Sequence, residues 1–170
     1  LLRRLYGPEN LQWDTDLPAR EKESWVSWLE ELIQETEVHM ERAVRPAGAL
    51  EGPVIAGFSE ASISKTCATM YVVWQMKEGP PVSRLLLAKV RVTPISGFLI
   101  PRAELQAVVI MVRLLILILR AAAFKASRVV LATDSACCVA AMRKVGVSMN
   151  AFFANRVSEV RHTLIEAREL

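Results

Sequence analysis

The sequence predicts an α/β fold in which helices pack on the faces of a mixed sheet, preceded by a helical N-terminal extension. Strand-like segments follow one another over residues 54–92, residues 107–124 are apolar nearly all round, and residues 128–133 form a β-branched apolar run. A helix as apolar as residues 107–124 would be is usually buried against a sheet. A run like residues 128–133 is typical of a central strand. With 170 residues, 52% of them hydrophobic, the chain is long enough for one domain with a real core.

The charges and the cysteines narrow the classes of function. Lys and Arg number 21 and Asp and Glu 18, for a formal net charge of +3, and the two signs are mixed along the chain. This balance permits a nucleic-acid partner without requiring one. The odd number of cysteines (Cys67, Cys137 and Cys138) and their lack of metal-type spacing favour reduced thiols in an intracellular compartment, cytoplasmic or nuclear. The opening LLRRLYGPEN lacks the apolar core of a signal peptide.

Residues 1–48 are rich in charge and tryptophan, and we expect them to form a helical connection segment. A helix is predicted from about Pro18 to about Thr36, because Asp16 can cap it and proline suits the first turn. Its apolar face, which we expect to pack on the following domain, contains Trp25, Trp28, Leu29 and Leu32. A linker to the second domain, residues 49–170, is marked by Pro46, Gly48, Gly52 and Pro53.

The second region begins with strands joined by short turns. Strands are predicted at residues 54–59 and 67–76, and the small polar turn between them indicates a hairpin. The sequence KEGPP makes another turn, after which residues 83–92 alternate partially in polarity and form a third strand.

A long helix is predicted from Pro101 to about Phe124. Its most apolar part is interrupted by Arg113 and Arg120, so the uninterrupted runs are far shorter than the roughly 18 residues of a membrane span. We therefore expect a buried core helix and no membrane partner. The chain then continues with three predicted elements, which are a strand at 128–133, a short helix at 135–145 and a last helix at 151–169.

Carboxylates occupy the places where α/β proteins usually build their sites. Glu60 ends the first strand, Asp134 ends the strand at 128–133, and Glu104 lies in the first turn of the long helix. A helix N-terminus favours negative charge, so Glu104 is suited to binding a cation. Taken singly, each residue also has a plainer role. Glu104 can be an ordinary helix-start acid, Asp134 can cap the next helix and Glu60 can be exposed turn polarity.

Taken with their flanking residues, these carboxylates resemble those of a known family. The stretches GFSEAS, IPRAELQA and LATDSACCV, in this order and at these spacings, resemble the RNase H-like domain of BEL/Pao-type retrotransposon polyproteins. LLLAKVRVTPISGFLIPRAEL is similar to the third strand of that domain and the loop into its first helix, and FFANRVSEV is similar to its late helix. LQWDTDLP resembles the connecting segment that precedes the domain. The resemblance spans essentially the whole chain and implies an RNase H-like mixed sheet.

The resemblance also implies a chemistry. In this family, acidic side chains hold two Mg²⁺ (or Mn²⁺) ions, which activate a water and stabilise the leaving oxygen while the RNA of an RNA–DNA hybrid is hydrolysed. By this carry-over Glu60 bridges both ions, and Glu104 and Asp134 each complete one side. The reverse transcriptase part of a polyprotein is an implied partner. Phosphate contacts are implied for Lys89, Arg91 and Arg102, although a solvated strand edge explains these basic residues equally well.

Two departures from the family pattern lead us to expect weak or lost hydrolysis. Glu60 stands where the family usually has Asp, and one extra methylene moves the carboxylate by about 1 Å, which Mg²⁺ tolerates poorly. The family's fourth carboxylate follows a further strand, and the sequence ends at Leu170, so we expect a domain that lacks both. The main alternative is a non-catalytic remnant or domesticated domain that binds nucleic acid or protein. A structural connection segment within a longer polyprotein is a third interpretation.

Overall fold

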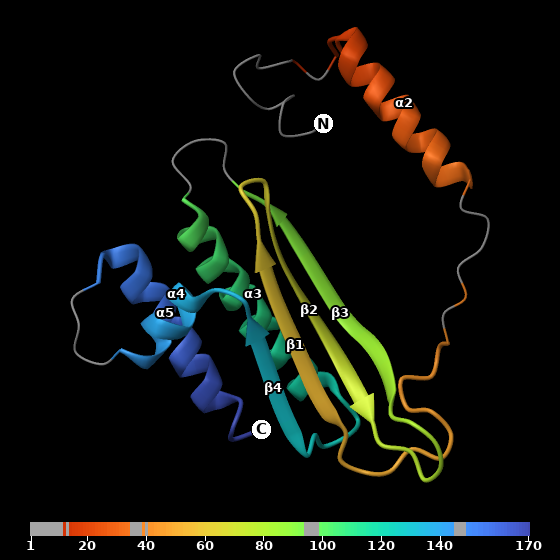
Figure 1. The fold of residues 1–170 in the computed structure, drawn as a ribbon, viewed down its shortest axis with the longest axis vertical. Helices are drawn as coiled ribbons and strands as arrows, with labels where there is room; N and C mark the ends of the chain where they lie inside the picture. The colour runs from red at the N-terminus through yellow and green to blue at the C-terminus, as the bar shows by residue number, and fades with distance from the viewer. Residues whose placement is uncertain (1–11, 13, 35–38, 40, 94–98, 145–148) are drawn as a thin grey trace. The chain divides into compact units, whose positions relative to one another are not determined.

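The computed structural model describes residues 12, 14–34, 39, 41–93, 99–144 and 149–170. The chain divides into two units, Leu1–Arg42 and Ala43–Leu170. The N-terminal unit contains helix α2 (Ala19–Gln34), drawn in orange in Figure 1. No residue of α2 is buried, and the rings of Trp25 and Trp28 lie side by side with centroids 5.0 Å apart. The predicted helix therefore forms, while the partner for its apolar face stays a prediction.

The second unit is built on a four-stranded mixed sheet with the order β3-β2-β1-β4 (Figure 1). As predicted, β1 (Val54–Ala61), β2 (Lys65–Trp74) and β3 (Val82–Val92) pair in sequence as antiparallel neighbours. β4 (Arg128–Thr133) pairs with β1 in parallel and lies at an edge of the described sheet, so the expectation of a central strand at 128–133 was wrong. The strand that leads to Asp134 therefore lies beside the strand that carries Glu60.

Three helices complete this unit, namely α3 (Ile100–Ala121), α4 (Ala136–Arg143) and α5 (Ala151–Glu166). Helix α3 packs across β1 and β2 and contacts α5 along its length. Parallel strands cannot be joined by a tight turn, so the chain passes through β2, β3 and α3 before β4 returns to the side of β1. Among the described residues, no helix combines the length and the apolar character that crossing a membrane requires.

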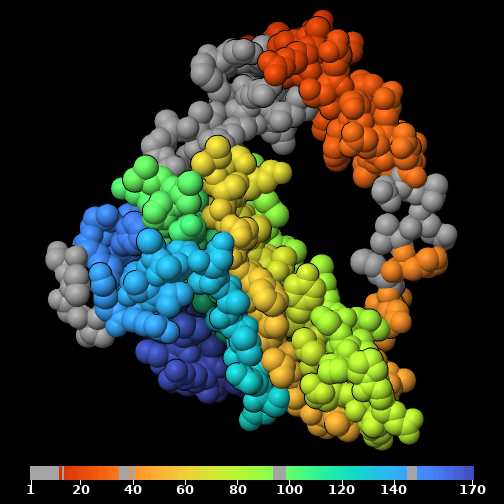
Figure 2. Space-filling model, in the orientation of Figure 1, coloured from red at the N-terminus to blue at the C-terminus, as the bar shows by residue number. Residues whose placement is uncertain are grey.

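The core lies between α3 and one face of the sheet. Alternate residues of β2, such as Met70 and Val72, are fully buried there, together with Leu105 and Val112 of α3. The residues between them point to the opposite face, where exposed Phe58 packs edge to face against Tyr71. Figure 2 shows this second face, on which the strands lie at the surface with no helix of the second unit over them.

Gly57 allows α3 and β4 to approach β1 closely. A Cβ atom at this position would lie 2.7 Å from Cδ2 of Leu131, 2.7 Å from Sδ of Met70 and 3.2 Å from Cγ of Met111. These separations are shorter than ordinary carbon contacts, which are about 3.5–4.0 Å. The core at this point therefore has no room for a side chain.

We expect Gly57→Ala to lower the free energy of unfolding by about 1–3 kcal/mol, because the added methyl group overpacks a filled core. The entropic gain that usually accompanies a Gly to Ala change, about 0.4–1 kcal/mol, is smaller and of opposite sign. Urea denaturation followed by circular dichroism measures the difference. An unchanged or higher midpoint would show that the side chains of Leu131 and Met70 move aside at no cost.

Candidate functional site

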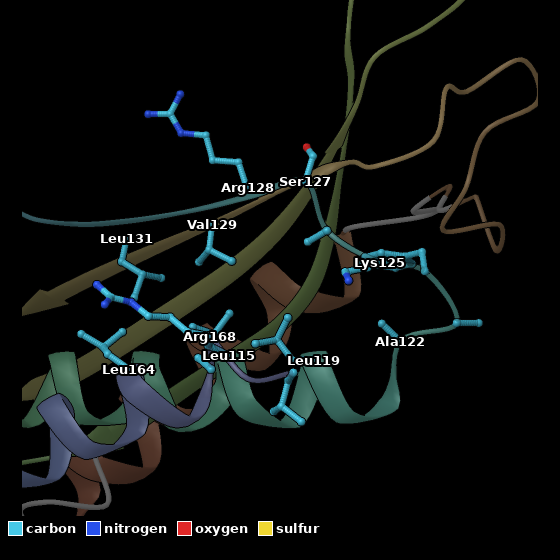
Figure 3. A pocket seen from close by; sticks show the side chains of 15 residues that line it. Leu115, Leu119, Ala122, Lys125, Ser127, Arg128, Val129, Leu131, Leu164 and Arg168 are labelled. Carbon is cyan, nitrogen blue, oxygen red and sulfur yellow. The ribbon is translucent and has the colours of Figure 1, made fainter.

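One cavity lies at the N-terminal end of β4, whereas the predicted carboxylates Glu60 and Asp134 lie at the opposite end of the sheet. It has a volume of about 750 Å³ and lies between α3, the start of β4 and the end of α5 (Figure 3). Leu115, Leu131 and Leu164 line it, with Arg128 and Arg168 among its polar residues. None of its lining residues is an acid, a histidine or a cysteine, so it offers none of the side chains that usually bind metal ions.

Glu60 lies near the end of β1, on the uncovered face of the sheet. It is exposed and follows Ser59, which is buried on the α3 side, because successive strand residues point to opposite faces. Its carboxylate is folded back onto the chain, and Oε1 accepts a hydrogen bond of 2.7 Å from the backbone N–H of Ala61. Beside it, the Cys67 thiol donates to the Glu60 carbonyl oxygen at 3.5 Å.

Asp134 directly follows β4 and is exposed. Because β1 and β4 are parallel neighbours, their C-terminal ends meet, and Glu60 and Asp134 line one pocket of about 250 Å³. The pocket is bounded by Phe58, Thr133 and Cys67. The structure thus brings together two of the three predicted carboxylates, whereas Glu104 is not among the residues that line this pocket.

Glu104 is held by a hydroxyl group at the start of α4. Helix α3 begins at Ile100 with Leu99 as its N-cap, and its first turn contains no acid, so Glu104 lies just beyond that turn. The prediction that Glu104 lies in the first turn was therefore wrong, because the helix begins at Ile100, one residue before Pro101. The Ser135 Oγ donates a hydrogen bond of 2.6 Å to Oε2 of Glu104. This contact draws Glu104 to the residue next to Asp134.

Ser135 also caps α4, a role that the sequence alone left open for Asp134. Its Oγ accepts a hydrogen bond of 3.2 Å from the backbone N–H of Cys138, so the cap is the serine and not the aspartate. Ser135 is 5% exposed. Sequence reasoning missed its contact with Glu104, although a serine just before a predicted helix is an ordinary cap signal.

We expect Ser135→Ala to lower the free energy of unfolding by about 1–2 kcal/mol, since loss of an N-cap typically costs about 1 kcal/mol and Glu104 also loses a donor. Ser135→Thr is the control, because it keeps the hydroxyl group. Thermal unfolding of both variants measures the effect. If the threonine variant is destabilised as much as the alanine variant, the space around residue 135 matters rather than the hydroxyl group.

Cys138 lies beneath this group of residues and is unsuited to nucleophilic chemistry. Burial raises the pKa of its thiol, and although the hydrogen bond with Ser135 opposes that shift, the nearby negative charges of Glu104, Cys137 and Asp134 raise the pKa further. The thiol therefore stays protonated near neutral pH, and the protonated form is the unreactive one.

The predicted phosphate contacts fall in two separate places. Lys89 and Arg91 are exposed on β3, with β2 and β1 between them and β4. Arg102 lies in the first turn of α3, and its guanidinium group is 5.1 Å from the ring centroid of Phe152 in α5. Sequence reasoning missed Phe152 and its second cationic neighbour, Arg156, because their proximity to α3 depends on the tertiary packing of α5.

The carboxylates, as they lie, do not form a site for divalent metal ions. Within the described ranges, no three His, Cys, Asp or Glu side chains lie close enough together to hold a metal ion. Glu60 is engaged by the backbone of Ala61 and Glu104 by the hydroxyl group of Ser135. Ions about 3.5–4 Å apart need oxygen atoms from all three carboxylates at once, so these side chains do not fit a two-ion centre without rearrangement.

Comparison with known proteins agrees with the fold and the motifs. A family model described as "Pao retrotransposon-like RNaseH-like domain" matches residues 1–135, a range that contains Glu60, Glu104 and Asp134 and ends before α4 and α5. No curated protein matches the sequence. Because the matched range covers most of the 170 residues, the chain belongs to the Pao retrotransposon-like RNaseH-like domain family.

Proposed function

We propose that this chain is a retroelement RNase H-like domain that binds RNA–DNA hybrids and whose metal-dependent hydrolysis of RNA is weak or lost. Family membership supports the substrate class. The observation that carries the loss of activity is the separation of the acids, because Glu60 and Asp134 share a pocket that Glu104 does not line. The resemblance implies a second reason for weak activity, which is that Glu60 stands where the family usually has Asp.

The hydrogen bonds of two of the carboxylates support this proposal through the directions in which they hold them. Glu60 is held toward the backbone N–H of Ala61 and Glu104 toward the hydroxyl group of Ser135, each through one carboxylate oxygen. Hydrogen bonds to ionised groups contribute about 1.5–3 kcal/mol each, so turning either carboxylate away from its present partner to complete a shared metal site would oppose metal binding. Bound divalent ions would supply a nucleophilic water and neutralise the leaving oxygen.

The cellular context follows from the same family. The reverse transcriptase part of a Pao-type polyprotein is the proposed protein partner, since the hybrid is the product of reverse transcription. The free thiols of Cys67, Cys137 and Cys138 support a reducing compartment, which we propose to be cytoplasmic or nuclear.

A non-catalytic nucleic-acid-binding role is the second candidate. It is favoured by the same separation of Glu60 and Asp134 from Glu104, which leaves the family fold in place without a formed metal centre. The two candidates share binding of the hybrid, and residual cutting of the RNA strand would favour the first over the second.

A cleavage assay tests the proposal. Incubated with a labelled RNA–DNA hybrid and Mg²⁺ or Mn²⁺, the unaltered chain is expected to cut little RNA, and Asp134→Asn is expected to remove any residual cutting. The Asp134→Asn variant is the matched control for a contaminating nuclease, because it changes one oxygen for a nitrogen. Rapid cleavage that depends on Mg²⁺ and disappears in this variant would show an intact site and overturn the claim of lost activity.

A further inference from the structure

Helices α3 and α5 lie side by side (Figure 1) and meet along a seam. Successive contacts along the seam advance in the same direction on both helices, so the helices run parallel. Each contact joins one side chain of α3 to one of α5, and the pairs are Arg102 with Phe152, Gln106 with Arg156, Arg113 with Glu159 and Arg120 with Glu166.

The two ends of this seam differ in charge. At the C-terminal end, Arg113 and Arg120 are each paired with a glutamate, with a distance of 2.6 Å from Arg113 to Glu159. At the N-terminal end, neither Arg102 nor Arg156 is paired with a carboxylate in the part of the chain that the structure describes. Within the described ranges, the two guanidinium groups at this end of the seam thus have no carboxylate partner.

An aromatic ring holds these two groups in place. The guanidinium groups of Arg156 and Arg102 lie 3.9 Å and 5.1 Å from the ring centroid of Phe152, within the distance at which cations are attracted to aromatic rings. The Arg156 Nε also donates to Oε1 of Gln106 at 3.2 Å. Stacking and this neutral hydrogen bond hold the two groups, and among the described residues their other N–H donors have no hydrogen-bond acceptor.

This arrangement has the chemistry of a phosphate site. Guanidinium groups present their N–H donors in a planar fork that matches phosphate oxygens, and a group already held in position loses less entropy when it binds. Arg102 lies two residues before Glu104 on α3, so the cluster lies at the same end of the helix as the candidate carboxylates, while Glu104 itself is directed to Ser135.

We infer that the cluster of Arg102, Phe152 and Arg156 binds the phosphodiester backbone of a nucleic acid at the N-terminal end of α3 and α5. The choice of nucleic acid over another polyanion rests on the proposed function. Arg102 alone was a candidate from the sequence, whereas Arg156 and its aromatic support belong to α5, outside the residues that the family model matches.

Binding of a fluorescein-labelled RNA–DNA duplex, followed by fluorescence anisotropy in EDTA so that nothing is cut, tests the inference. Arg102→Gln and Arg156→Gln are each expected to weaken binding roughly tenfold at about 0.05 M salt. Each should also make the dependence of log K on log salt shallower by about 0.9, the value for one phosphate contact.

Arg113→Gln is the matched control. It removes the same charge from the same seam, but its guanidinium group is already paired with Glu159, so the affinity and the salt dependence should stay close to those of the unaltered chain. Arg156→Lys keeps the charge and is expected to retain most of the salt dependence. Thermal unfolding of every variant identifies any that fails to fold. If Arg156→Gln does not fold, the affinity and salt dependence of Arg156→Lys are compared with those of the unaltered chain instead.

Three results would overturn the inference. The first is the absence of any binding by the unaltered chain, and the second is unchanged binding in the Arg102→Gln and Arg156→Gln variants. The third is equal weakening by Arg113→Gln, which would show that binding follows net charge alone. Failure of the proposed function has a different signature, because a chain that binds the duplex through Arg102 and Arg156 and cuts it rapidly supports the inference and contradicts only the loss of activity.

Discussion

Glu60→Asp is expected to raise Mg²⁺-dependent cleavage of an RNA–DNA hybrid by up to about 100-fold, the factor by which a displacement of about 1 Å can slow catalysis. The shorter side chain withdraws the carboxylate by about one methylene group, toward the position that the resemblance implies for the family's aspartate. Mg²⁺ demands near-ideal octahedral geometry, so the rate should respond to this shift more strongly in Mg²⁺ than in a more tolerant ion. Initial rates with a labelled hybrid measure the change.

Two further variants serve as controls for the cleavage rate of Glu60→Asp. Glu60→Gln keeps the length of the side chain and removes the charge, so it should leave the rate at or below that of the unaltered chain. Asp134→Asn placed in the Glu60→Asp background should return the rate to the baseline. If Glu60→Asp cuts no faster than the unaltered chain in either Mg²⁺ or Mn²⁺, residue 60 is not the limiting defect of the pocket.

Leu105→Ala is expected to lower the free energy of unfolding by about 2–5 kcal/mol. Leu105 has 0% of its surface exposed and belongs to the main core cluster beneath α3. Its truncation removes buried apolar surface and leaves a cavity that the surrounding side chains fill only in part. The free energy of unfolding from urea titration, with the slope checked for constancy, measures the loss.

Leu117→Ala on the same helix is the control for Leu105→Ala. Leu117 is 58% exposed, so its truncation should change the stability by no more than about 0.5 kcal/mol. A comparable loss in both variants would mean that the burial of residue 105 does not decide the effect, since alanine itself favours the helix.

The strands and helices of the second unit could be predicted because local patterns specify them. The β-branched run at 128–133 became β4 with the same bounds, and the turns around residues 61–65 and 77–81 produced the two antiparallel pairs. Helix ends were less accurate, since they depend on single capping contacts. The start of α3 at Ile100 rather than Pro101 was enough to move Glu104 out of the first turn.

The site was harder to predict than the fold, because its contacts join residues far apart in the sequence. The hydrogen bond from Ser135 to Glu104 and the stacking of Arg156 on Phe152 beside Arg102 have no signal in local periodicity. The sequence motifs identified Glu60, Glu104 and Asp134 as candidates, but side-chain direction decides which of them share a pocket. Alternation along β1 places Glu60 on the face opposite to buried Ser59.

The parallel pairing of β1 with β4 has a consequence for how the chain acquires its structure. Val54 meets Val73 after a short hairpin, but it meets Arg128 only after β2, β3 and α3 have intervened. Contacts between residues distant in sequence cost more loop entropy and slow folding. The antiparallel strands can therefore associate early, and the pocket that joins Glu60 to Asp134 is completed only when β4 docks, which makes it a late event in folding.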